Sequence, residues 1–250
     1  RLLITDVISG PQGVPEFIKT ALVRVPLRLG FDVFDKGEIS AIKMEKILKT
    51  IKSYKLLLDV YEVRHLKACA TSAMRDASNA PEIIKKVKAE TGIEIQIISG
   101  DSEASLIYEN HVAESMTRDE SYLYVDVGGG STELTFFSDG KLIFKKSFNI
   151  GTIRLLKNQV NEAIWDEMKE FIRTKTKGFH HVTAIGSGGN INKIFSLSKR
   201  KEGKPLSLEL LRDYYKEFSN LSLSQRISLH KLREDRADVI VPALQIYTRV

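Results

Sequence analysis

The sequence predicts an α/β protein made of two related domains with a cleft between them. A pair of strands opens the chain and is followed by alternating helices and strands, and the same order restarts near residue 122. The polar stretch "AESMTRDES" (113–121) separates the two halves. This order of elements is typical of α/β domains that bind ligands at the ends of their strands. We place the first domain at residues 1–118 and the second at residues 119–250.

The first domain is expected to begin with two strands, at 1–8 and 16–28, joined by the turn "SGPQG". Residues 29–40 are predicted to form a loop, after which Ser40 caps a helix with apolar residues at helical spacing. The stretch "HLKACAT" (65–71) predicts a buried strand.

The rest of the first domain follows the same alternation. A helix is expected to start at Asn79, which precedes Pro81 as an N-cap, and to end at Gly92. The stretch "IEIQIIS" (93–99) predicts another strand, and residues 102–115 predict a helix.

The second domain is expected to open with a three-stranded meander. Residues 122–127 and 132–137 predict strands, and Asp139 and Gly140 form a hairpin turn into a third strand at 141–149. The remaining elements are a helix at 161–174 with Trp165, Phe171 and Ile172 in its core, a strand at 181–186, and further helices, the last from about residue 234.

The composition is that of an ordinary globular protein, with 42% hydrophobic and 28% charged residues. No apolar run reaches the roughly 20 residues that span a membrane. The single Cys69 excludes an internal disulfide and any cysteine metal cluster, and we interpret it as a buried core residue of a cytoplasmic protein. The net charge of +6 comes from lysines spread thinly along helix faces, so no nucleic-acid-binding motif is indicated.

Three consecutive glycines separate two strands in "YVDVGGGSTEL" (124–134). They remove every Cβ from one face of the turn, so that a group can approach the backbone closely and several N–H groups can converge on it. Free amides and hydroxyls suit phosphate oxygens, and carboxylates suit a hard cation. A structural bulge is the alternative for the glycines alone, but the polar neighbours favour phosphate. The residues concerned are Asp126, Gly128, Gly129, Gly130, Ser131, Thr132 and Glu133.

Motifs lie in order along nearly the whole chain. The stronger ones are "ATSAMRDASN" (70–79), "ISGDSEASLIY" (98–108), "YVDVGGGSTEL" (124–134) and "IGSGGNINKI" (185–194), and the weaker ones are "VPLRLGFDVF" (25–34) and "DRADVIVPAL" (235–244). Together they resemble the exopolyphosphatase and guanosine pentaphosphate phosphohydrolase family. That resemblance implies an α/β fold of two ribonuclease H-like, actin-like lobes, as in sugar kinases and Hsp70 ATPases.

The resemblance also implies roles for individual residues. Glu103 matches the family's general base, although it could equally be a helix-start carboxylate without a catalytic role. Glu133 would orient the attacking water or a metal-bound water from across the cleft. Asp126 would hold Mg²⁺, and its alternative is a turn residue. Arg75 would bind phosphate with its planar guanidinium, and its alternative is an ion pair with Asp76 or a helix end.

A second glycine turn follows the strand at 181–186. Its residues are Gly186, Ser187, Gly188 and Gly189, and its amides would face an anion or, as in related ATPases, a nucleoside. A plain strand-to-helix connection is the alternative.

Two departures from the family pattern stand out. The family's first phosphate loop, an acidic-glycine-serine turn, is expected immediately before Arg1 in a longer polypeptide. Ser102 also occupies the place of the first of two glutamates, so that only Glu103 remains.

The resemblance implies a Mg²⁺-dependent phosphoanhydride hydrolase that releases terminal phosphate from inorganic polyphosphate. Hydrolysis of the 5′ phosphate of guanosine pentaphosphate is the close alternative, since both substrates present the same reacting group. A nucleotide-binding regulator without turnover is the alternative of another class. The partners expected are these phosphate compounds and a second copy in a homodimer, rather than nucleic acid or a membrane.

Overall fold

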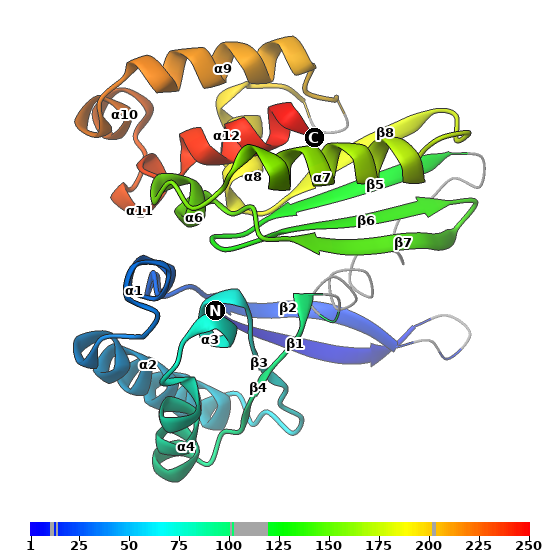
Figure 1. Ribbon diagram of the computed structural model, residues 1–250. Coiled ribbons are helices and arrows are strands. Elements are labelled where there is room, and N and C mark those ends of the chain that lie inside the picture. The colour runs from blue at the N-terminus through cyan, green and yellow to red at the C-terminus, as the bar shows by residue number, and fades with distance from the viewer. Residues whose placement is uncertain (11–12, 14, 101, 103–119, 202–203) are drawn as a thin grey trace. The chain divides into compact units, whose positions relative to one another are not determined.

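The protein folds into two compact units in a computed structural model, which describes all 250 residues except 11–12, 14, 101, 103–119 and 202–203 (Figure 1). Unit 1 comprises Arg1–Ala70 and Met74–Ile97, and unit 2 comprises Thr71–Ala73 and Ile98–Val250. The predicted boundary between residues 118 and 119 falls outside the described residues and stays a prediction.

Unit 1 contains two separate two-stranded sheets. In the first, β1 (Leu2–Ser9) pairs antiparallel with β2 (Pro15–Val23), and in the second, β3 (Ala68–Ala70) pairs parallel with β4 (Ile95–Ile97). The helices are α1 (Gly30–Lys36), α2 (Ala41–Val60), α3 (Ser72–Asp76), which lies where the chain passes between the units, and α4 (Ala80–Thr91).

The structure corrects three expectations in unit 1. Strand β2 ends at Val23 rather than at residue 28, in keeping with Pro26, which has no N–H to offer a sheet. The predicted loop 29–40 contains α1, which Gly37 ends in the left-handed conformation (φ 75°). Cys69 is exposed rather than buried, because its side chain lies on the uncovered face of the short strand β3.

The two predicted caps in unit 1 behave differently. The Ser40 hydroxyl accepts a hydrogen bond from Lys43 N, as a helix cap should. Asn79 stands at the N-cap position of α4, but its side chain makes no cap bond. It binds the backbone of Ile39 instead, accepting from N at 3.0 Å and donating to O at 2.8 Å. Asn79 therefore ties α4 to the start of α2.

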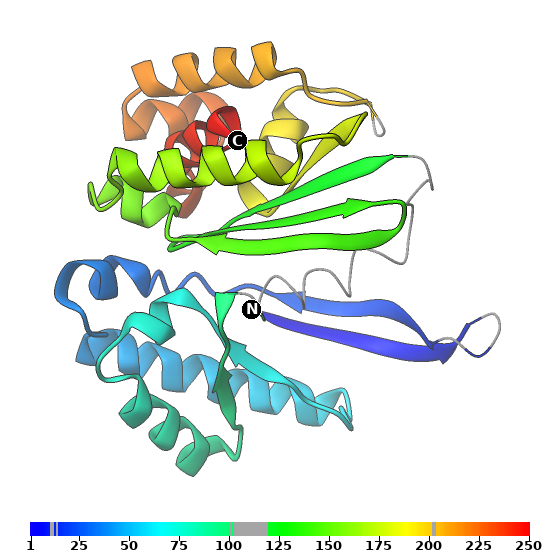
Figure 2. The same ribbon diagram turned by 45° about the vertical axis from the view of Figure 1, so that its right-hand side comes forward.

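The sheet of unit 2 is continuous across four strands, in the order β7-β6-β5-β8 (Figure 2). The strands are β5 (Ser121–Val127), β6 (Thr132–Ser138), β7 (Lys141–Phe148) and β8 (Val182–Ser187). Strand β5 pairs antiparallel with β6 and parallel with β8. Asp139 and Gly140 form the turn between β6 and β7 with positive φ values of 51° and 70°, as a type I′ hairpin requires.

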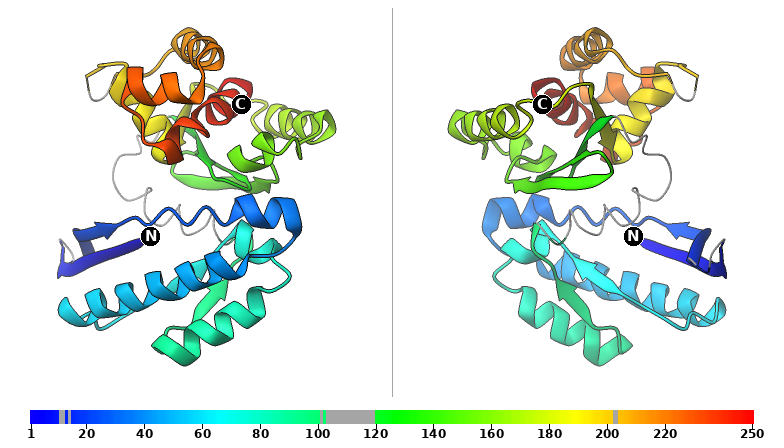
Figure 3. Two further views of the ribbon diagram at one scale, coloured as in Figure 1. Left: turned by 90° about the vertical axis from the view of Figure 1, so that its left-hand side faces the viewer. Right: turned by 90° about the vertical axis from the view of Figure 1, so that its right-hand side faces the viewer.

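Helices cover one face of this sheet (Figure 3). The helices of unit 2 are α6 (Thr152–Leu156), α7 (Glu162–Lys175), α8 (Gly189–Leu197), α9 (Leu208–Asn220), α10 (Leu223–His230), α11 (Glu234–Ala237) and α12 (Ile240–Arg249). Of these, α7 and α12 pack directly against the sheet, and α9 packs against α12. Asn161 caps α7 through its side chain, which accepts from Ile164 N. The last predicted helix, from residue 234, is divided into α11 and α12.

One face of β5 packs against the core of unit 2, and the other face carries Asp126. Leu123, Val125 and Val127 pack against α7 and α12 through Trp165 and Ile246, among others. Because side chains alternate along a strand, Asp126 lies on the opposite face. Among the described residues no helix is long and apolar enough to cross a membrane.

Candidate functional site

Four polar side chains form a row across the sheet of unit 2. Glu133 of β6 lies directly opposite Asp126 of β5, Ser147 of β7 lies opposite Glu133, and Ser187 of β8 lies opposite Asp126. Residues that pair directly across strands share one face of the sheet, with Cβ atoms about 5 Å apart in an antiparallel pair. The sequence therefore places two carboxylates side by side, with a hydroxyl on each flank. We call these four residues the polar row.

Each hydroxyl of the polar row donates to its neighbouring carboxylate. The Ser147 hydroxyl donates to Glu133 Oε1 at 2.9 Å, and the Ser187 hydroxyl donates to Asp126 Oδ1 at 2.7 Å. Glu133 is buried, with 2% of its surface exposed. Like charges directly opposite in a sheet destabilise it. The serines fix the orientation of the two carboxylates, and a bound cation would offset their repulsion.

The glycine turn, Gly128–Ser131, lies next to the polar row, at the end of β5. It connects β5 to β6, and Gly128 N donates to Ser131 O at 2.9 Å. Its carbonyl groups face the start of α6: Gly128 O accepts from Thr152 N at 3.0 Å, and Gly129 O accepts from Ile153 N at 2.8 Å. The next carbonyl, Gly130 O, accepts from Arg154 Nε at 2.8 Å.

These bonds decide where the amide groups of the turn point. In a trans peptide the N–H points opposite to the C=O of the same peptide group, and no described peptide bond is cis. Since three carbonyls in a row face α6, the N–H groups of Gly129, Gly130 and Ser131 point away from it. None of the three donates to a backbone carbonyl among the described residues. A run of N–H groups that point to the same side of a turn can bind an anion.

The glycines of the turn lack side chains because α6 packs closely against their backbone. None of Gly128, Gly129 and Gly130 has a positive φ, so left-handed geometry is not the reason for glycine here. A Cβ on Gly129 would stand 3.1 Å from Ile153 Cδ1. A Cβ on Gly151 would overlap the carbonyl group of Gly129. The group that approaches the backbone on this side is therefore α6, which leaves the other side for a ligand.

Thr132 has a structural bond in this arrangement. Its hydroxyl donates to Ile150 O at 2.6 Å and the residue is 0% exposed. Its donor is thus committed to the fold, and its role as a phosphate ligand, like that of Ser131, stays a prediction.

The second glycine turn adjoins Asp126. Gly188 connects β8 to α8 with φ 103°, and a Cβ there would stand 3.3 Å from Asp126 Oδ1. Gly186 belongs to β8 and not to the turn, and it is packed against Ile191 and Tyr247. Gly189 is the first residue of α8. The two turns therefore lie on either side of Asp126.

Tyr247 supports this second turn from α12. Its hydroxyl donates to Ser187 O at 2.6 Å. Burial, followed by the nearby Asp126 carboxylate, raises the pKa of Tyr247, so the phenol stays protonated and remains a donor. Tyr247 also lines an apolar cavity of about 410 Å³, together with Gly186, Ile191, Phe195, Leu206 and Leu211.

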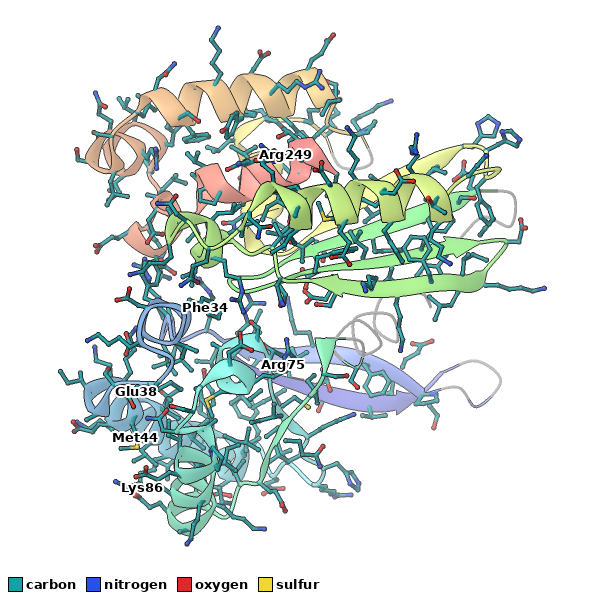
Figure 4. All side chains as sticks on the ribbon, in the orientation of Figure 1. Phe34, Glu38, Met44, Arg75, Lys86 and Arg249 are labelled. Carbon is teal, nitrogen blue, oxygen red and sulfur yellow. The ribbon has the colours of Figure 1, made fainter. Side chains whose placement is uncertain are left out.

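Two further predicted site residues, Arg75 and Glu103, are not part of the polar row or of the two glycine turns. Arg75 is half-buried on α3 (Figure 4) and belongs to unit 1, whereas the polar row belongs to unit 2. Glu103 lies outside the described residues. Gly100, just before it in the chain, stands so close to Ser147 that a Cβ would be 2.5 Å from Ser147 Cβ. Gly100 is thus packed against Ser147 of the polar row.

The residues that support the site were not predicted from the sequence. Ser147, Gly151 and Arg154 lie in "SFNIGTIR" (147–154), and Tyr247 lies on α12. A glycine and an arginine just after a predicted strand were the available signal. Their partners are distant in sequence, so only the folded chain reveals the contacts.

Comparison with known proteins identifies the family. Residues 20–250 match the profile of the Ppx/GppA phosphatase family. The chain belongs to this family.

Two curated relatives share part of the chain. A protein named bifunctional 3-dehydroquinate synthase/phosphatase from Fusobacterium nucleatum is 38% identical over 162 residues, covering 62% of this chain and 24% of that protein. Exopolyphosphatase 1 of Mycobacterium tuberculosis is 29% identical over 158 residues, covering 62% of this chain and 44% of that protein. The matched region is less than half the length of these relatives.

Solved structures share the fold over nearly the whole chain. An exopolyphosphatase from Cytophaga hutchinsonii matches 99% of this chain and 85% of its own, with 25% identity and a TM-score of 0.77. The Ppx/GppA family member from Aquifex aeolicus matches 99% of this chain and 84% of its own, with 25% identity and a TM-score of 0.70. The predicted family and the predicted α/β class are confirmed.

Proposed function

We propose that this chain carries the catalytic unit of a Mg²⁺-dependent phosphoanhydride hydrolase that releases terminal phosphate from inorganic polyphosphate. The observation that carries the proposal is the glycine turn, where three consecutive N–H groups point away from α6 beside two paired carboxylates. Phosphoryl transfer depends mainly on positioning and on charge stabilisation around the transferred group. Membership of the Ppx/GppA phosphatase family supports the same reaction.

Different residues of the chain would bind the phosphate and the cation. The N–H groups of Gly129, Gly130 and Ser131 would donate to the oxygens of the terminal phosphate and hold it in place. The Asp126 carboxylate, fixed by Ser187, and the Glu133 carboxylate, fixed by Ser147, would hold a divalent cation. Two carboxylates beside a phosphate form a set of ligands that suits Mg²⁺. Bound Mg²⁺ would neutralise charge on the phosphate oxygens.

The general base is assigned by resemblance to Glu103, which would accept the proton of the attacking water. Arg75 is proposed as a further phosphate ligand. A cytoplasmic location and a homodimeric assembly belong to the same proposal and await direct measurement.

Guanosine pentaphosphate is the second candidate substrate. The apolar cavity of about 410 Å³ beside the second glycine turn has the size and lining of a small-molecule pocket. A nucleoside in this cavity would be recognised by Phe195 and Tyr247 and the surrounding aliphatic side chains. Polyphosphate would make no use of such a pocket, so binding of a nucleoside there would favour guanosine pentaphosphate.

The test is phosphate release by the purified full-length protein from long-chain polyphosphate, guanosine pentaphosphate and ATP, each with Mg²⁺ and with EDTA. We expect Mg²⁺-dependent release from polyphosphate, and a decrease in kcat of roughly 10²–10⁴ for Glu103→Gln. Glu82→Gln is the matched control, because Glu82 is an exposed carboxylate in the first turn of α4.

Three outcomes would change the proposal. Release only from guanosine pentaphosphate would select the second candidate. Binding without release from any substrate would indicate a regulator. A Glu103→Gln enzyme within about threefold of the unsubstituted one would move the base role to Glu133.

A further inference from the structure

The segment Ser147–Arg154 holds two parts of the site at once. It runs from the end of β7 into α6. At its start the Ser147 hydroxyl binds Glu133, and at its end Arg154 Nε binds Gly130 O at 2.8 Å. Between them, Gly151 lets α6 reach the carbonyl of Gly129.

The three N–H groups of the turn are not held in the same way. The Gly129 and Gly130 amides are directed by carbonyls that accept from the backbone N–H groups of Thr152 and Ile153. Those bonds do not depend on the side chains of α6. The Ser131 amide is directed by the Gly130 carbonyl, which accepts from the side chain of Arg154. The Gly128 carbonyl also accepts from the Thr152 hydroxyl at 3.4 Å, beside its backbone bond. Among the described residues, the Gly130–Ser131 peptide is therefore the one whose carbonyl is held by a side chain without a backbone donor.

We propose that Arg154 is a positioning residue of the phosphate site. Its Nε–H fixes the Gly130 carbonyl on the α6 side, so that the Ser131 N–H faces the bound phosphate. This inference rests on the proposed function for the identity of the ligand. It assigns to Arg154 no contact with the substrate: the guanidinium acts through the peptide that it holds.

Lysine cannot replace this contact. The fourth side-chain atom beyond Cα is Nε in arginine and a methylene carbon in lysine. Arg154→Lys therefore keeps the positive charge but places a CH₂ group where the donor stood. The substitution separates the hydrogen bond to Gly130 from the general attraction of a cation for phosphate.

The experiment is a titration of the ¹⁵N-labelled full-length protein with inorganic phosphate. NMR reports the amide signals of the turn, and calorimetry measures the Kd for phosphate. In the unsubstituted protein the signals of Gly129, Gly130 and Ser131 should all shift as phosphate binds. In Arg154→Lys and Arg154→Met the Ser131 response should be lost, while those of Gly129 and Gly130 persist. The Kd for phosphate should rise about 10- to 100-fold, the usual effect of one charge-assisted hydrogen bond.

Lys169→Met is the matched control, because Lys169 is an exposed cation on α7. Its Kd should stay within about twofold of the unsubstituted value, as expected for a screened surface charge. Arg154→Lys also covers the case in which Arg154→Met does not fold.

Either of two results would overturn the proposal. In the first, Ser131 responds normally in Arg154→Lys and only loss of charge weakens binding. In the second, none of the turn amides responds in the unsubstituted protein. Failure of the proposed function is recognised separately: a protein whose turn amides respond to phosphate but which releases none from polyphosphate leaves the role of Arg154 standing.

Discussion

Both units contain antiparallel strands followed by two helices and a further strand, but they build different sheets. In unit 2 the strand β5 pairs on both sides, so that the hairpin partner β6 and the parallel strand β8 belong to one sheet. In the described part of unit 1 the hairpin β1-β2 and the parallel pair β3-β4 are separate sheets. A row of polar side chains can cross four strands only where the hydrogen bonding is continuous. The difference explains why the polar row occurs in unit 2.

This difference predicts that substitutions in unit 2 and in unit 1 have different effects on activity and on stability. Substitutions in the polar row and its supports should lower activity with little effect on the stability of unit 1. A substitution at a charged contact in unit 1 should lower stability and leave catalysis unchanged. The following experiments test this division, from the largest expected effect to the smallest.

Asp126→Asn should have the largest effect on turnover. It keeps the shape and the bond from Ser187 but removes the charge that would hold Mg²⁺. We expect kcat to fall roughly 10²–10³-fold, as for the loss of one electrostatic contact in an active site, with a higher Mg²⁺ requirement. Asp139→Asn, at the far end of the same sheet, is the control and should be near normal. Unchanged kcat and Mg²⁺ dependence in Asp126→Asn would mean that Asp126 is a turn residue and does not hold the metal.

Gly151→Ala should disturb the glycine turn from the α6 side. The new methyl group overlaps the Gly129 carbonyl, so the turn or α6 must move. We expect kcat/KM to fall by about 10², because small displacements of positioned groups are costly, and the free energy of unfolding to fall by about 1–3 kcal/mol. Steady-state kinetics and urea unfolding measure the two effects. A variant with normal kinetics would show that the turn is not held against α6.

Ser147→Ala should misorient Glu133 without removing its charge. We expect kcat to fall about tenfold, in the range of a lost hydrogen bond, with KM little changed and an altered pH–rate profile. Ser147→Thr keeps the hydroxyl, although its extra methyl group crowds Gly100. Ser219→Ala removes an exposed helix hydroxyl on α9 and serves as the control. An unaltered pH profile in Ser147→Ala would mean that Glu133 does not depend on this bond.

Asp32→Asn tests the expectation for unit 1, where a substitution should affect stability and not catalysis. Asp32 pairs with Lys43 and accepts from Ser40 N at 3.1 Å. Burial acts to raise the pKa of Asp32, but the bonds from Lys43 and Ser40 outweigh it and lower the pKa. A lowered carboxyl pKa means that the stabilisation is complete above the unfolded pKa of about 3.9 and is lost as the pH falls through the lower, folded value.

The substitution should therefore cost about 1–3 kcal/mol at pH 7 and less at a pH well below the unfolded pKa of about 3.9, with kcat unchanged. Thermal unfolding at both pH values, together with phosphate release at pH 7, measures this. Lost activity without lost stability would break the division between the units.

Much of the site was predictable because its residues are adjacent in sequence. Asp126, the three glycines and Glu133 lie within eight residues, and a hairpin brings the two carboxylates together whatever the rest of the fold does. The helix α1 was missed because its seven residues, Gly30–Lys36, gave too short a periodic pattern. Cys69 was misjudged because an apolar stretch does not show which face of a three-residue strand is covered.

The sequence by itself determined the local features: the β5–β6 hairpin, the alternation that places Asp126 opposite the core, and the family. Only the tertiary structure decided the direction of the turn amides, because it depends on α6 and Arg154, which lie more than 20 residues away. It also decided that Ser187 and Tyr247, some 60 residues apart, meet beside Asp126. Local pattern follows from backbone geometry and side-chain alternation, whereas contacts between distant segments follow from packing, which no single stretch of sequence records.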